Sequence, residues 1–96
     1  MDKIIRAGVV GVGSLGQHHA RIYANMEGVK LTCVVDVSEK GREIADKYGA
    51  AFFTDYRKIL DMVDVVSIAA PTILHYKIAK FFIENKKHVL LEKPMT

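Results

Sequence analysis

The sequence contains a single cysteine, no block of like charge and no apolar run of membrane-spanning length, and each absence excludes a class of protein. Because Cys33 has no second cysteine to pair with, an internal disulfide is excluded, and we expect a buried, inert thiol in a reducing compartment. No signal peptide precedes the first apolar stretch, and the apolar runs are too short to cross a bilayer. The expected location is therefore the cytoplasm, with no membrane partner.

The charged residues are nearly balanced and are scattered along the chain. Fourteen Lys and Arg residues stand against eleven Asp and Glu residues, which gives a formal net charge of +3. The scatter is typical of solvated faces rather than of a nucleic-acid footprint, so no nucleic-acid partner is expected. The 96 residues, half of them apolar, suffice for one domain with a modest core.

A glycine-rich segment follows directly on the first apolar stretch. It reads Gly-Val-Gly-Ser-Leu-Gly and opens a segment with helical periodicity. In a dinucleotide-binding βαβ unit, Gly11 permits the tight turn, Gly13 lets a diphosphate approach the backbone, and Gly16 lets the helix pack against the sheet. Ser14 and Leu15 lie at the start of that helix, where unpaired N–H groups and a partial positive charge suit a diphosphate.

An acidic residue completes this pattern. Asp36 ends the second apolar run, about 20 residues after Gly16, where its carboxylate would accept hydrogen bonds from the hydroxyls of the adenine ribose. A 2′-phosphate there would meet a like charge, and the adjacent Val37 offers no guanidinium to offset it. The nearest arginine downstream, Arg42, falls inside a predicted helix. NAD is therefore expected in preference to NADP. A phosphate-binding NTPase is disfavoured, because no Gly-Lys-Ser/Thr follows the glycine loop.

Short apolar runs alternate with helical patterns through the whole chain. This alternation predicts an α/β fold, a doubly wound parallel sheet of the Rossmann type with strand order 3-2-1-4-5 and the sixth strand missing. Strands are expected over residues 3–11, 30–36, 51–53, 65–69 and 88–91, and helices over residues 14–27, 39–48, 56–62 and 72–85. Ser38 and Gly49 are expected to cap the helix between them. The expected inward-facing helix residues are Leu15, His19, Ile22 or Tyr23, Met26, Gly41, Ile44, Ala45, Tyr48, Leu74, Ile78, Phe81 and Phe82.

The carboxyl ends of parallel strands meet at one edge of the sheet, and ligands bind outside that edge where the strand order reverses. Besides the glycine loop, this edge is expected to collect Asp36, the turn that contains Ala70 and Pro71, and the last residues, Glu92 and Lys93. The distinctive residues of the chain therefore converge on one rim.

A metal site is not expected. The adjacent residues His18 and His19 point about 100° apart on a helix, so they do not readily chelate one ion. His19 is instead expected to pack where the helix meets the sheet.

Three features beyond the glycine pattern resemble a known family, and the resemblance covers the whole chain. They are His19 after the glycine loop, Pro71-x-x-x-His75 after the fourth strand, and Glu92-Lys93-Pro94 after the fifth. Together with the glycine pattern they resemble the glucose–fructose oxidoreductase / inositol dehydrogenase (Gfo/Idh/MocA) family. Each motif alone is common, whereas the combination is specific.

The resemblance implies an oxidoreductase that transfers a hydride between NAD(P) and a hydroxyl carbon of a sugar, cyclitol or nucleotide-sugar. It implies that Lys93 hydrogen-bonds the reacting hydroxyl, and that Glu92 and His75 line the nicotinamide-ribose side. A cation beside a developing alkoxide lowers the barrier electrostatically, and a lysine whose pKa falls on partial burial also accepts the hydroxyl proton.

The length of the chain departs from the family pattern. Family members pair this domain with a second, mostly β domain that carries much of the substrate site and usually the oligomer interface. Residues 1–96 are therefore expected to be an incomplete dinucleotide-binding domain, with the C-terminal substrate domain absent and no turnover by the chain alone. A homo-oligomer is expected, and the apolar edge of the fifth strand invites pairing with another chain.

Two other functions stay open at this point. A non-catalytic nucleotide sensor or regulatory domain would carry the same fold without hydride transfer. A methyltransferase that uses S-adenosylmethionine also has a glycine-rich turn and an acid after the second strand, but Gly16 and the Glu-Lys-Pro sequence argue against it.

Overall fold

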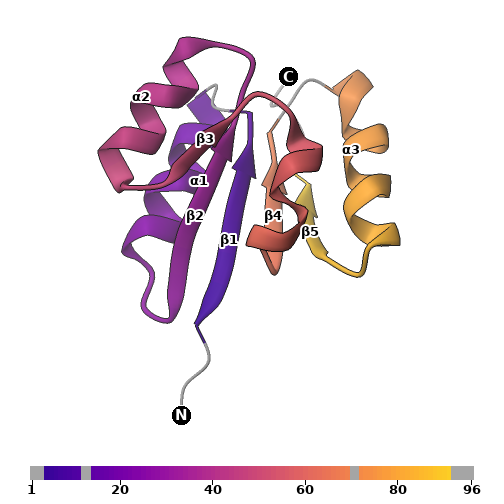
Figure 1. Ribbon diagram of the computed structural model, residues 1–96, viewed down its shortest axis with the longest axis horizontal. Coiled ribbons are helices and arrows are strands. Elements are labelled where there is room, and N and C mark those ends of the chain that lie inside the picture. The colour runs from indigo at the N-terminus through magenta and orange to yellow at the C-terminus, as the bar shows by residue number, and fades with distance from the viewer. Residues whose placement is uncertain (1–3, 12–13, 70–71, 92–96) are drawn as a thin grey trace.

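Five parallel strands form one sheet between two helical layers (Figure 1). The computed structural model describes residues 4–11, 14–69 and 72–91, with the backbone alone for residues 14, 15, 72–75 and 91. The elements are β1 (Ile5–Val10), α1 (Ser14–Asn25), β2 (Val29–Val35), α2 (Glu39–Tyr48), β3 (Ala51–Phe53), the 3-10 helix η1 (Tyr56–Met62), β4 (Val65–Ile68), α3 (Thr72–Glu84) and β5 (His88–Leu91). The order β3-β2-β1-β4-β5 confirms the predicted doubly wound topology, and within the described residues no sixth strand joins the sheet.

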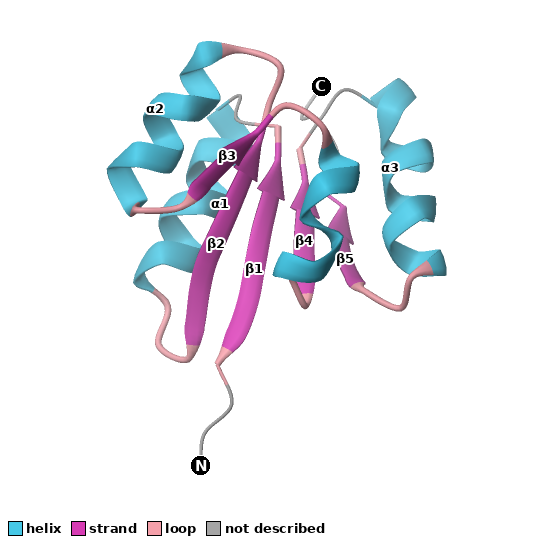
Figure 2. Cartoon of the chain, in the orientation of Figure 1, coloured by secondary structure: helices cyan, strands magenta, loops and turns pink. Residues whose placement is uncertain are grey.

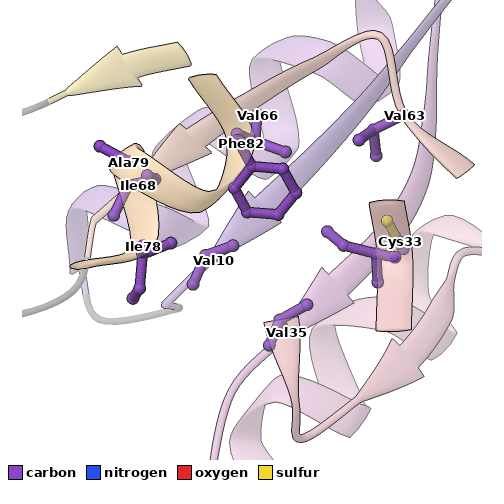
Figure 3. Close-up of a cluster of buried hydrophobic side chains, with 10 residues drawn as sticks. Val10, Cys33, Val35, Val63, Val66, Ile68, Ile78, Ala79 and Phe82 are labelled. Atoms are coloured by element: carbon purple, nitrogen blue, oxygen red, sulfur yellow. The ribbon is translucent and has the colours of Figure 1, made fainter. Parts of the chain in front are cut away.

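Two apolar cores lie on opposite faces of the sheet, because successive side chains of a strand point to opposite sides. Figure 2 shows the helices placed on either side of the strands. The core under α1 and α2 contains Val9, Ala20, Leu31, Val34 and Ala45. The larger core, under η1 and α3, contains Val10, Cys33, Val35, Ile59, Val63, Val66, Ile68, Ile78, Ala79 and Phe82 (Figure 3). Burial on both faces explains the nearly continuous apolar runs of the central strands.

A β-bulge interrupts β2 at Thr32. The pairing register jumps from Leu31 opposite Ala7 to Cys33 opposite the next residue of β1. The Thr32 hydroxyl donates toward the carbonyl oxygens of Ala7, at 3.2 Å, and Met62, at 2.9 Å. Because the extra residue shifts the alternation, Leu31 packs in the core under α1 and α2, whereas Cys33 packs in the opposite core.

The ends of α2 lie where the sequence predicted them, with Ser38 at the N-cap and Gly49 at the C-terminal cap. Gly49 adopts the left-handed conformation (φ 69°), and its N–H bonds to the carbonyl oxygens of Ala45 and Asp46. Ser38 occupies the N-cap position, yet its hydroxyl caps none of the described N–H groups of α2. Its backbone N–H instead donates to a carboxylate oxygen of Asp36 at 2.9 Å. The predicted N-cap position of Ser38 is therefore confirmed, although no side-chain capping bond accompanies it.

The inner face of α1 differs from the predicted one at its end. The helix ends at Asn25, whose side-chain amide donates to the carbonyl oxygen of Arg21 at 2.8 Å. Met26 therefore leaves the helical path and is 44% exposed, so its assignment to the core was wrong. Ile22 is 38% exposed, and Tyr23 takes the inward place, packed against the core under α1 and α2. The predicted inward-facing side of α1 is therefore confirmed at Tyr23 and is wrong at Met26, one turn later.

Candidate dinucleotide-binding site

Gly11, the residue that follows β1, has a backbone conformation that favours glycine. Gly11 follows the strand with φ 91°, in the left-handed region that residues with a β-carbon rarely adopt. Its N–H donates to the carbonyl oxygen of Val35 at 2.7 Å, which ties the turn to the end of β2. Helix α1 then begins at Ser14, so the predicted strand–turn–helix arrangement is present. Gly13 lies outside the described residues, as do the side chains of Ser14 and Leu15.

Gly16 lies against that turn. A β-carbon built on Gly16 would come within 1.8 Å of the Gly11 carbonyl oxygen and within 3.6 Å of the Ala69 β-carbon. Only a residue without a side chain lets α1 approach Gly11 this closely, whereas the distance to Ala69 is an ordinary van der Waals contact. This close packing of the start of a helix on a strand end is the arrangement that accompanies a diphosphate site in dinucleotide-binding domains.

Asp36 stands at the end of the neighbouring strand. Its N–H donates to the carbonyl oxygen of Phe53 at 3.1 Å, and one carboxylate oxygen accepts the N–H of Ser38 at 2.9 Å. The side chain is half-buried against Gly41, where an added β-carbon would lie 2.7 Å from the Asp36 β-carbon. Asp36 is therefore held at the strand end, next to Val37, whose side chain is 89% exposed.

The carboxyl ends of β1, β2 and β4 meet at one rim, as expected. Val10 pairs with Val35 on one side and with Ile68 on the other, and Ala69 donates its N–H to the carbonyl oxygen of Val10 at 2.8 Å. The residues that follow these strands are thereby brought together at Gly11, Asp36 and Ala69.

Five other predicted site residues are not placed in this way. Ala70, Pro71, Glu92 and Lys93 lie outside the described residues, and His75 is described only as part of the α3 backbone. Their assignments remain predictions.

A buried hydrogen bond that was not predicted anchors α1 to the sheet. The Tyr23 hydroxyl lies 2.5 Å from the hydroxyl oxygen of Ser67, which is fully buried on β4. The buried ring of His19 packs against Tyr23, with ring centroids 6.5 Å apart, which confirms that His19 lies at the contact of helix and sheet. The signal available in the sequence was one serine inside an apolar run, Val65-Val66-Ser67-Ile68, because a buried hydroxyl needs a partner.

Cys33 is not a nucleophile candidate. Burial raises the pKa of its thiol to about 11, with a hydrogen bond from Thr32 acting in the opposite direction. The thiolate is therefore scarce at neutral pH, which confirms the interpretation of a buried, inert thiol.

Among the described side chains, no three His, Cys, Asp or Glu residues converge to hold a metal ion. His18 is exposed and His19 buried, and their ring centroids lie 6.4 Å apart. Within the part of the chain that the structure describes, no helix is long and apolar enough to cross a membrane.

The fold and the rim define a dinucleotide-binding domain of the doubly wound class. Residues 5–96 match the model of the Gfo/Idh/MocA oxidoreductase family, described as an NAD-binding Rossmann fold. The chain belongs to this family, and the predicted resemblance is confirmed.

Several curated relatives are named as dehydrogenases, and one, of Escherichia coli, is named as a 2,7-anhydro-N-acetylneuraminate hydratase. UDP-N-acetylglucosamine 3-dehydrogenase of Acidithiobacillus ferrooxidans is 38% identical over 93 residues, which are 96% of this chain and 29% of the relative. Inositol 2-dehydrogenase of Salmonella typhimurium is 34% identical over 97 residues, which are 95% of this chain and 29% of the relative. The chain thus spans about 29% of the length of these relatives.

Solved structures of relatives share the fold closely. GenD2 from gentamicin A biosynthesis, in complex with NAD, superposes with a TM-score of 0.90 at 35% identity, covering 96% of this chain and 27% of that one. Scyllo-inositol dehydrogenase from Lactobacillus casei, with bound NAD(H) and scyllo-inositol, gives a TM-score of 0.87 at 29% identity, covering 96% and 28%.

Proposed function

We propose that the chain is the dinucleotide-binding part of an NAD-dependent oxidoreductase. The parent enzyme would move a hydride between the nicotinamide and a hydroxyl-bearing carbon of a sugar, cyclitol or nucleotide-sugar. The observation that carries this proposal is the close contact of Gly16 with Gly11, beside the carboxylate of Asp36 at the next strand end. The substrate class rests on relatives named as dehydrogenases of UDP-N-acetylglucosamine and inositol.

The glycine turn would hold the diphosphate. Gly16 lets α1 start directly against Gly11, and Gly13, Ser14 and Leu15 complete the loop in sequence. The start of an α-helix generally favours a negatively charged group, because its first N–H groups are not bonded within the helix.

Asp36 would accept hydrogen bonds from the adenine-ribose hydroxyls and repel a 2′-phosphate. The adjacent Val37 brings no positive charge, which supports NAD over NADP. The Ser38 N–H bond already orients the carboxylate at the strand end.

The nicotinamide end of the site would lie further along the rim. We assign Ala70, Pro71, His75 and Glu92 to this end, and Lys93 to the reacting hydroxyl. The cofactor supplies the centre that accepts or returns the hydride. Lys93 would hydrogen-bond the substrate hydroxyl as a neutral amine and take its proton as the hydride leaves, and the ammonium so formed would stabilise negative charge on the oxygen.

Catalysis would need more than these residues. Because the chain spans about 29% of the length of its relatives, the substrate-selecting groups are proposed to lie in a further domain of the whole protein. We expect residues 1–96 alone to bind the cofactor without turning over a substrate.

Calorimetric titration of the chain with NADH and NADPH tests the proposal, with Asp36→Ala as the informative variant. Wild-type chain should bind NADH more tightly than NADPH, and the variant should lose at least about tenfold in NADH affinity, as expected for two charge-assisted hydrogen bonds. Asp46→Ala is the matched control, because it removes an exposed carboxylate from the far end of α2.

Two results would contradict the proposal. A folded chain that binds neither cofactor would remove the dinucleotide site. Tighter binding of S-adenosylmethionine than of NADH would instead support a methyltransferase.

A further inference from the structure

An ion pair lies on the first turn of α2, close to Asp36. The Arg42 guanidinium donates through Nε to a carboxylate oxygen of Glu39 at 3.0 Å. The same guanidinium stands over the Phe52 ring, with its central carbon 5.0 Å from the ring centroid. Arg42 is thus held by one charged and one aromatic partner.

Phe52 connects this pair to the rim. A β-carbon built on Gly41 would lie 2.7 Å from the Phe52 ring and 2.7 Å from the Asp36 β-carbon. Both side chains therefore meet over Gly41, the residue directly before Arg42. Asp36, Glu39, Arg42 and Phe52 form one cluster at the carboxyl ends of β2 and β3, which we name the α2-entry cluster.

The α2-entry cluster contains a group suited to a phosphate. A guanidinium offers a planar fork of N–H donors that matches phosphate oxygens in a bidentate way. In this cluster the Arg42 guanidinium is already paired with the Glu39 carboxylate. The two carboxylates, Asp36 and Glu39, also outnumber the single positive charge of Arg42. A 2′-phosphate arriving beside Asp36 would therefore meet net negative charge.

We propose that Glu39 is a second determinant of the preference for NAD, acting as a positioning residue that holds Arg42 over Phe52 and away from a 2′-phosphate. Arg42 is then a latent phosphate ligand, which becomes available only when both carboxylates are removed. This inference rests on the proposed dinucleotide site.

The expected effect is modest, because both partners of the ion pair are largely exposed. The side chains of Arg42 and Glu39 are 58% and 82% exposed, and such surface pairs contribute little free energy. Releasing Arg42 should therefore change NADPH affinity by about fivefold rather than by orders of magnitude.

The test is a series of calorimetric titrations with NADH and NADPH. The single variant is Asp36→Ser. The double variant adds Glu39→Gln to it, and the triple variant adds Arg42→Met to the double variant. Glu39→Gln in the Asp36→Ser background should raise NADPH affinity about fivefold and leave NADH affinity unchanged. Adding Arg42→Met should abolish that gain.

Two controls separate this role from a loss of bulk charge. Glu43→Gln removes an exposed carboxylate from the same helix, one turn further on, and should not raise NADPH affinity. Lys40→Met in place of Arg42→Met should leave the gain intact. Circular dichroism and thermal unfolding of each variant establish that it is folded.

Several outcomes would overturn the inference. The inference fails if Glu39→Gln brings no gain in NADPH affinity, if Glu43→Gln brings an equal gain, or if the gain survives Arg42→Met. In each of these cases the proposed function still stands, provided that the wild-type chain binds NADH. If wild-type chain binds neither cofactor, the inference fails together with the proposed function.

Discussion

Gly16 and Gly11 approach so closely that a β-carbon on Gly16 would lie 1.8 Å from the Gly11 carbonyl oxygen. The contact places the first turn of α1 directly on the turn that leaves β1. It therefore couples the packing of the helix to the shape of the proposed diphosphate cradle.

Gly16→Ala should weaken both folding and cofactor binding. The added methyl collides with backbone that cannot rotate away, so α1 or the turn must shift, at a cost of about 1–3 kcal/mol in the free energy of unfolding. NADH affinity should fall at least about tenfold, because the N–H groups move away from the diphosphate. Urea unfolding and calorimetry measure the two effects. His18→Ala, an exposed position in the same helix, is the control, and equal NADH binding by Gly16→Ala would refute the cradle.

Tyr23→Phe should destabilise the chain by leaving the buried Ser67 hydroxyl without its phenol partner. The expected loss is about 1–3 kcal/mol in the free energy of unfolding. Ser67→Ala added to Tyr23→Phe should recover part of that loss, because the stranded hydroxyl is then removed. A double-mutant cycle by urea unfolding measures the coupling. Strictly additive effects would mean that the two hydroxyls do not stabilise each other.

Cys33 should lower the free energy of unfolding of the chain at alkaline pH. Burial raises the pKa of the folded thiol from 9.0 to about 11, so above about pH 9 the unfolded chain ionises first. Below pH 9 the thiol is protonated in both states and the free energy of unfolding is unaffected by it. As the pH rises from 9 to about 11, the free energy of unfolding should fall by an amount on the order of 2 kcal/mol. Cys33→Ala should lack this part of the alkaline loss. Parallel stability curves for both proteins between pH 8 and about pH 11 would contradict the assignment.

The free edge of β5 should drive self-association of the isolated chain. Within the described sheet β5 pairs only with β4, and Leu90 is 45% exposed on it. Analytical ultracentrifugation should show association that grows with concentration and that Leu90→Lys reduces, because a charged edge strand resists pairing. Ile83→Lys, which adds the same charge on α3, should have a smaller effect. A clean monomer at high concentration would eliminate this prediction.

Local signals made much of the fold predictable. The bounds of α2, β3, η1 and β5 coincide with the ranges expected from the sequence. These segments are bounded by residues whose effect is local, such as Gly49, which takes the left-handed backbone that ends α2. The starts of α1, β4 and α3 also coincide with the expected ones, whereas their C-terminal ends and both ends of β1 and β2 moved by one or two residues, because helix fraying and strand pairing depend on neighbours.

The error at Met26 has a different origin. Met26 continues the helical spacing of Tyr23, yet α1 stops at Asn25 and leaves Met26 44% exposed. Apolar spacing predicts which face of a helix is buried, but it does not say where the helix ends. Ser38 stands at the predicted N-cap position, and only its side-chain capping bond is missing.

The sequence by itself determined the order of strands and helices and the chemistry of the rim. The spacing of apolar residues, the glycine loop and Asp36 are short-range patterns, and they sufficed to predict a Rossmann domain with a dinucleotide fingerprint. Only the tertiary structure decided the bulge at Thr32, the bond between Tyr23 and Ser67, and the position of Arg42 over Phe52. Each of these is a relationship between different elements, set by how strands and helices pack, and no local pattern of residues specifies such a pair in advance.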